Sequence, residues 1–109
     1  MDRMALYMIL SIDSTNRDKI IVSLDGIQII EEQKLGSQVL LPLIVKILKK
    51  QKANFKDISE IKVETGPGSF TGTRVGTAVA NALGFALNIP VNGKKGKIAE
   101  PIYEKSKFD

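Results

Sequence analysis

The residues best suited to chemistry cluster in one glycine-rich segment, Gly66-Pro67-Gly68-Ser69-Phe70-Thr71-Gly72. This segment stands between a predicted strand and a predicted helix, where glycines let backbone amides approach an anion and the helix N-terminus adds partial positive charge. Gly66, Gly68, Ser69 and Thr71 are therefore candidate residues for binding a nucleotide or another anion. The spacing matches neither a P-loop nor a dinucleotide fingerprint. A tight structural turn, with Ser69 or Thr71 capping the helix, is the alternative interpretation.

A second candidate is Asp13, which follows the first predicted strand and precedes Ser14-Thr15-Asn16. A carboxylate at that place could hold magnesium bound to a nucleotide phosphate. The alternative is an aspartate that simply begins a polar turn. The chain contains no His and no Cys, which argues against a zinc site, a histidine general base and a cysteine nucleophile. We therefore expect no metal site built from His or Cys.

Length and composition indicate one ordinary folded domain. The chain has 109 residues, of which 43% are hydrophobic and 26% charged, and its net charge of +4 is compatible with an RNA partner without requiring one. The longest early apolar stretch, residues 4–12, falls far short of the roughly 20 residues that a membrane span needs. No small-residue cleavage site follows that stretch. The expected location is the cytoplasm, with no membrane association.

The elements that must position these residues follow from the apolar periodicity. Three strands are predicted at the start of the chain, the second and third joined by Asp25-Gly26, a strong hairpin signal. An amphipathic helix, a fourth strand, the glycine-rich segment, a second helix and a short fifth strand follow, and Ser37 is the expected N-cap of the first helix. The order β-β-β-α-β-α-β predicts an α/β fold with a mixed five-stranded sheet and flanking helices. The predicted strands cover residues 7–12, 19–24, 27–33 and 58–64 and the start of a strand near 91, and the helices cover 39–52 and 75–87.

The two helices are also candidate partner surfaces. The second helix is rich in Ala and Gly, which lets another helix approach closely, and the first offers leucine and isoleucine anchors. The alternative is that the same residues only cover the sheet. A Gly76→Arg change is expected to abolish partner binding and to leave the fold intact. The interface candidates are Leu40, Leu41, Ile44, Leu48, Arg74, Gly76, Val79, Ala80 and Leu83.

Four segments together resemble the TsaB (YeaZ) family in order and spacing. They are residues 9–15 (ILSIDST), 37–44 (SQVLLPLI), 65–76 (TGPGSFTGTRVG) and 88–91 (NIPV). The resemblance implies a lobe of the actin-like, ribonuclease H-like fold. It also implies a role in making threonylcarbamoyladenosine on tRNA.

The resemblance further implies a non-catalytic subunit that pairs with a catalytic TsaD subunit through its helical surface. A TsaE-type ATPase can join that pair, the isolated subunit can form homodimers, and tRNA is contacted only indirectly. No cofactor is required, although ATP or ADP with magnesium could bind near Asp13. A hypothesis from another class is a minimal phosphotransferase or ATPase of the actin-like superfold, which would use Asp13 and the glycine loop.

The chain departs from the family pattern in three ways. The usual DTST turn reads Asp13-Ser14-Thr15-Asn16 here, Gly36 stands where the family often has His, and the chain has about half the family's length. We interpret residues 1–93 as the TsaB-like N-terminal lobe and 94–109 as a basic linker with a C-terminal tail. Residues 99–103 resemble the end of the family's chain, so the second lobe is interpreted as deleted, which removes one wall of the interlobe cleft.

Overall fold

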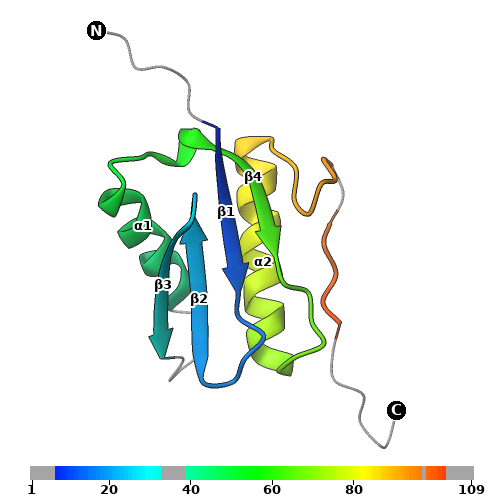
Figure 1. The fold of residues 1–109 in the computed structure, drawn as a ribbon. Coiled ribbons are helices and arrows are strands. Elements are labelled where there is room, and N and C mark those ends of the chain that lie inside the picture. Colours follow the sequence, from blue (N-terminus) through cyan, green and yellow to red (C-terminus); the bar gives the residue numbers. More distant parts are fainter. Residues whose placement is uncertain (1–6, 33–38, 97, 103–109) are drawn as a thin grey trace, which may run out of the picture.

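The computed structural model describes residues 7–32, 39–96 and 98–102. Among these residues, four strands form one mixed sheet in the order β3-β2-β1-β4, and two α-helices pack on it (Figure 1). Strand β1 pairs antiparallel with β2 and parallel with β4, and β2 pairs antiparallel with β3. The elements are β1 (Met8–Asp13), β2 (Lys19–Leu24), β3 (Ile27–Glu32), α1 (Leu40–Lys50), the short 3-10 helix η2 (Phe55–Asp57), β4 (Ile58–Val63) and α2 (Phe70–Leu87).

The predicted hairpin is confirmed between β2 and β3. Asp25 and Gly26 have φ values of 49° and 87°, as a two-residue type I′ turn requires, and Leu24 faces Ile27 across it. Because side chains alternate along a strand, this register fixes which residues of both strands share a face.

Both helices cover the same face of the sheet, α1 over β2 and β3 and α2 over β4 and β1. Alternate residues of β1 and β2 point into this layer and are buried, which is the pattern of a sheet covered on one side. The other face of the sheet carries half-buried and exposed side chains. The most deeply buried apolar side chains of the core are Leu10, Ile12, Ile20, Val22, Leu24, Leu40, Ile44, Ile47 and Ile61.

The described residues contain four strands, so the fifth strand of the prediction is absent as a strand. In its place, Val91 forms a single parallel bridge with Ile61 of β4. The two hydrogen bonds of this bridge run from Ile61 N to Pro90 O at 3.0 Å and from Asn92 N to Ile61 O at 2.8 Å. The chain then turns at Gly93, whose φ is +80°, and Lys94 pairs back with Val91. A glycine in the left-handed region reverses the chain at that point, so the strand cannot continue.

The helix boundaries also differ from the prediction. Helix α2 begins at Phe70 instead of residue 75, because the Ser69 hydroxyl accepts a hydrogen bond from Gly72 N at 3.2 Å and caps the helix there. Helix α1 is shorter than predicted, and its N-cap residue, Val39, makes no side-chain cap. The predicted cap Ser37 and the end of the third strand at Gln33 lie outside the described residues.

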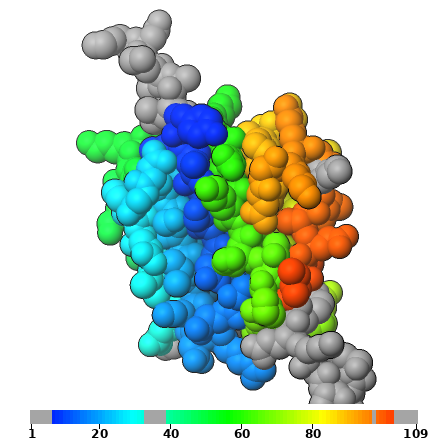
Figure 2. Space-filling model, turned by 45° about the vertical axis from the view of Figure 1, so that its right-hand side comes forward, coloured from blue at the N-terminus to red at the C-terminus, as the bar shows by residue number. Residues whose placement is uncertain are grey.

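Two asparagine side chains hold the irregular segments after α2. The Asn92 side chain accepts from Val63 N at 2.8 Å and donates to Val63 O at 3.0 Å, so it occupies the outer edge of β4 as a paired strand would. The Asn81 side chain forms the same reciprocal pair with the backbone of Ala99, both at 2.9 Å. Farther along, Ile102 N donates to Thr65 O. Residues 98–102 consequently lie along the fold beside β4 and α2 (Figure 2).

None of the helices in the described part of the chain has the length and apolar character that crossing a membrane requires.

Candidate functional site

The carboxyl end of β1 carries Asp13, and its carboxylate is engaged locally. Asp13 Oδ1 accepts a hydrogen bond from Thr15 N at 3.0 Å and another from the Thr15 hydroxyl at 2.7 Å. These bonds close an Asx-type turn, which is the turn-forming role weighed for this residue. Asp13 remains half-buried and also lines a hollow on the uncovered face of the sheet.

The glycine-rich loop lies directly against this turn. Gly66 has a φ of +107°, and a Cβ on Gly68 would lie 2.5 Å from Thr15 Cβ and 2.8 Å from Thr15 O. Ser69 N donates to Thr15 O at 2.8 Å, so the loop is joined to the turn through its backbone. The glycines therefore permit close contact between two segments of the protein itself.

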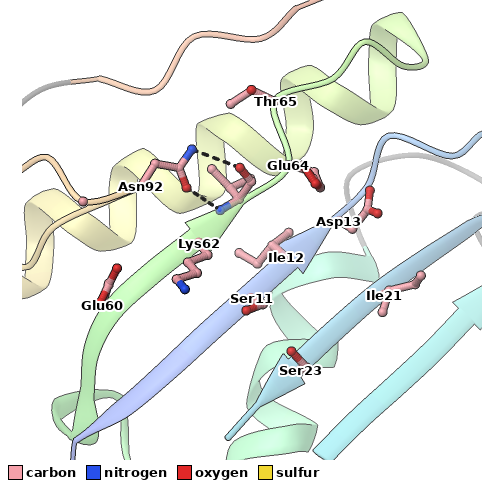
Figure 3. Close-up of a pocket in the computed structure, with 12 residues that line it drawn as sticks. Ser11, Ile12, Asp13, Ile21, Ser23, Glu60, Lys62, Glu64, Thr65 and Asn92 are labelled. Atoms are coloured by element: carbon pink, nitrogen blue, oxygen red, sulfur yellow. Dashed lines mark hydrogen bonds between the residues drawn. The ribbon is translucent and has the colours of Figure 1, made fainter. Parts of the chain in front are cut away.

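The hollow beside Asp13 has a volume of about 670 Å³ and spreads over β1, β2 and β4 (Figure 3). Its charged side chains are Asp13, Glu60, Lys62 and Glu64, and Ser11, Ile21 and Ser23 form its floor. Of the five anion-binding candidates, only Asp13 lines it. Thr71 lies on the first turn of α2 and lines a different hollow. The structure therefore joins Asp13 to Ser69 through Thr15 but does not gather the five candidates around one cavity.

Near the other end of this face, the Tyr7 hydroxyl donates a hydrogen bond to Glu60 Oε2 at 3.2 Å. That bond and the negative charge of Glu60 raise the pKa of the exposed Tyr7 phenol, because both favour its neutral form. Among the described residues, no three His, Cys, Asp or Glu side chains come together as a metal site would require.

Ser14 is a residue whose role the sequence analysis missed. Its side chain is fully buried, and its hydroxyl donates to Gly72 O at 2.6 Å, which ties the end of β1 to the first turns of α2. A Cβ on Gly76 would lie 2.1 Å from Ser14 Oγ. The sequence contains both residues, a serine directly after β1 and a glycine almost two turns into α2, but it does not show that the two segments touch.

The candidate partner residues divide into two groups. Leu40, Ile44 and Leu48 of α1 and Gly76 and Ala80 of α2 are buried within the fold. This corrects the expectation for these five: they pack inside the fold and cannot offer their side chains to a partner. The expectation that Gly76→Arg would spare the fold is corrected by the same geometry, because Gly76 faces Ser14 and Ile12. Leu41 and Arg74 are exposed, and Val79 and Leu83 are half-buried.

What we call the helical face consists of two exposed apolar residues, Leu41 of α1 and Ala78 of α2, and three half-buried ones, Val45, Val75 and Val79. Leu41 is 46% exposed, although burial of a leucine side chain away from water is energetically favourable. On α2 a shallow hollow of about 360 Å³ is lined by Thr71, Arg74, Val75, Ala78 and Val79. At its rim the Arg74 guanidinium lies 4.9 Å from the centroid of the Phe70 ring.

The sequence and the fold are similar to those of known proteins. Residues 8–93 match the family model described as "TsaD: tRNA N6-adenosine threonylcarbamoyltransferase". The tRNA threonylcarbamoyladenosine biosynthesis protein TsaB of Bacillus subtilis is 34% identical over 89 residues, covering 77% of this chain and 39% of the relative. A tRNA N6-adenosine threonylcarbamoyltransferase of Nitrosospira multiformis is 44% identical over 54 residues, covering 50% of this chain and 16% of that protein.

Among solved structures, YeaZ from Pseudomonas aeruginosa superimposes with a TM-score of 0.66 at 27% identity, covering 79% of this chain and 42% of that chain. The chain therefore spans less than half the length of these relatives. The shared part begins at β1 and ends just past α2.

Proposed function

Because this chain belongs to the threonylcarbamoyltransferase family, in its TsaB (YeaZ) branch, we propose that it is a non-catalytic subunit that supports a TsaD-type catalytic subunit in the modification of tRNA. The relatives named TsaB support a role in threonylcarbamoyladenosine biosynthesis, and the partner role is our own step beyond those names.

The observation that carries this proposal is the helical face. On the two helices that already cover the sheet, the exposed Leu41 and Ala78 and the half-buried Val45, Val75 and Val79 add an apolar strip that is partly open to the outside. A helix that is apolar on more than one stripe needs a second surface to cover. Small and β-branched side chains dominate the strip on α2, so a partner helix can approach its backbone closely.

The proposed non-catalytic role is supported by the side chains available. The chain has no His and no Cys, Asp13 Oδ1 accepts from Thr15, and Ser69 N of the glycine loop donates to Thr15 O. A TsaE-type ATPase would join the pair, and in the absence of a TsaD-type subunit the same helical face would join two copies of this chain.

The test is co-elution with the TsaD-type transferase of the same organism, followed by calorimetry. Ala78→Arg places a long charged side chain on an exposed position of the helical face, and arginine is a good helix former, so the fold is preserved. A disrupted interface centre typically costs about 2 kcal/mol or more, so we expect at least ~30-fold weaker binding.

Gln28→Arg is the matched control, because it adds the same side chain at an exposed position of β3, a strand that lies at the edge of the sheet. It should bind as the unchanged protein does. Binding of the Ala78→Arg protein at full affinity would show that the helical face is not the interface. If the unchanged chain binds no TsaD-type subunit at all, the proposed function is wrong.

A further inference from the structure

A second hollow, of about 330 Å³, lies where the C-terminal end of α2 meets the segment that follows it. We call it the Phe85 hollow. Its apolar surface comes from Phe85, Ile89, Val91 and Ile98, its charges from Lys94 and Lys95, and Asn88 adds an exposed amide. Within the described part of the chain, its lining contains no carboxylate. The hollow beside Asp13, in contrast, carries three carboxylates and one lysine.

The Phe85 ring projects into water because of how its neighbour packs. Gly84 is buried against Val91, where a Cβ would lie 2.4 Å from Val91 Cγ2, so the next residue along the helix points away. Phe85 is 90% exposed, and Ile98 beside the same hollow is 76% exposed. An aromatic ring presented in this way offers an exposed π-face at the edge of the hollow.

The two lysines are presented by an anchored turn. Lys94 exchanges backbone hydrogen bonds with Val91 at 3.1 and 3.2 Å, and Gly93 and Gly96 on either side have φ values of +80° and +78°. Both lysine side chains are exposed. Glu100 and Lys94 line the neighbouring hollow, so the positive charge is strongest on the side of Phe85.

We propose that the Phe85 hollow binds single-stranded RNA, with a base stacked on Phe85 and phosphates contacted by Lys94 and Lys95. Aromatic rings stack on any base and lysines neutralise phosphates, which is the combination that single-stranded RNA sites use. The two lysines of the lining, with no carboxylate among its described residues, favour a polyanion such as RNA over a protein partner. Lys94 and Lys95 lie beyond the residues that match the family, which end at 93, so this contact would be additional to an indirect role at tRNA.

The choice of tRNA as a natural ligand rests on the proposed function, but the binding itself is measured with this chain alone. The probes are a fluorescein-labelled 12-nucleotide RNA of mixed sequence and bulk tRNA, followed by fluorescence anisotropy and competition at two salt concentrations. Phe85→Ala should weaken binding about tenfold, within the range for loss of one base stack. Lys94→Gln with Lys95→Gln should weaken it further and make it less sensitive to salt.

The matched control is Lys46→Gln with Lys49→Gln, which removes the same charge from exposed positions of α1. All three sets of changes are at exposed side chains, and circular dichroism checks that each protein is folded. The control should change the affinity no more than about twofold, because α1 makes no contact with the RNA.

Equal losses in the control and in the Lys94–Lys95 variant, with no effect of Phe85→Ala, would mean non-specific attraction only and would overturn the proposal. So would the absence of binding by the unchanged chain. Loss of TsaD-type partner binding in Phe85→Ala, with RNA affinity unchanged, would assign the hollow to a protein and also refute it. Ala78→Arg should leave RNA binding unchanged, which separates this inference from the proposed function.

Discussion

Replacing Gly76 with alanine tests the close contact between β1 and α2. The added Cβ would lie 2.1 Å from Ser14 Oγ, 3.4 Å from Ser14 Cβ and 3.7 Å from Ile12 Cγ2. Only the first of these distances is too short, so the Ser14 hydroxyl must rotate away. It would then lose its 2.6 Å hydrogen bond to Gly72 O in a fully buried place.

The magnitude follows from two opposing effects. A buried hydroxyl left without its partner costs about 1–3 kcal/mol, whereas replacing glycine with alanine inside a helix gains about 1 kcal/mol. The expected net loss is therefore at most about 2 kcal/mol of unfolding free energy. With an m value of about 2 kcal/mol/M, the urea midpoint should fall by up to about 1 M.

A double-mutant cycle isolates the contact. Ser14→Ala removes the hydroxyl that blocks the new methyl group, so the double variant Ser14→Ala/Gly76→Ala should be more stable than the sum of the single changes by about 1 kcal/mol or more. Urea unfolding followed by circular dichroism measures all four proteins. Strictly additive effects of the two changes would refute the geometry of this contact.

Two further predictions concern the edge of β4 and the glycine loop. Asn92→Asp keeps the size of the side chain but cannot donate to Val63 O when ionised, so it should lower the unfolding free energy by about 1–2 kcal/mol at pH 7. Because the protonated acid can donate again, the loss should shrink below about pH 4, and equal urea midpoints for both proteins at pH 7 would contradict the assignment. Calorimetry with ATP and magnesium should give no dissociation constant tighter than about 1 mM, since Ser69 N and the Asp13 carboxylate already bond to Thr15. Micromolar binding would favour the phosphotransferase or ATPase hypothesis.

Local signals in the sequence were sufficient for much of the fold. Asp25-Gly26 defined the hairpin because a type I′ turn needs two positive φ values, and apolar periodicity located both helices and the four observed strands. The predicted fifth strand is absent for a local reason as well: the chain reverses at Asn92 and Gly93, both with positive φ, directly after Val91.

The candidate surfaces were harder to predict, because small residues serve two purposes. Gly76 and Ala80 permit close approach, but periodicity alone does not reveal whether the neighbour is a partner helix or the chain's own β1 and β4. The same ambiguity applies to the glycine loop: its glycines permit close approach to an anion or to another segment of the chain, and the structure shows Gly68 and Ser69 against Thr15. Only the three-dimensional contacts separate these interpretations.

The amide of Asn92 has a consequence for self-association. An open strand edge is a template on which further chains can add, and fibre growth requires two such edges on every molecule. In the described part of the chain, Asn92 and Pro90 occupy backbone groups along the outer side of β4 and Ile102 bonds to Thr65 just beyond it, while no strand pairs with the outer side of β3. Strand addition is therefore confined to one side, so that growth through the sheet would stop at a pair of chains instead of continuing into a fibril.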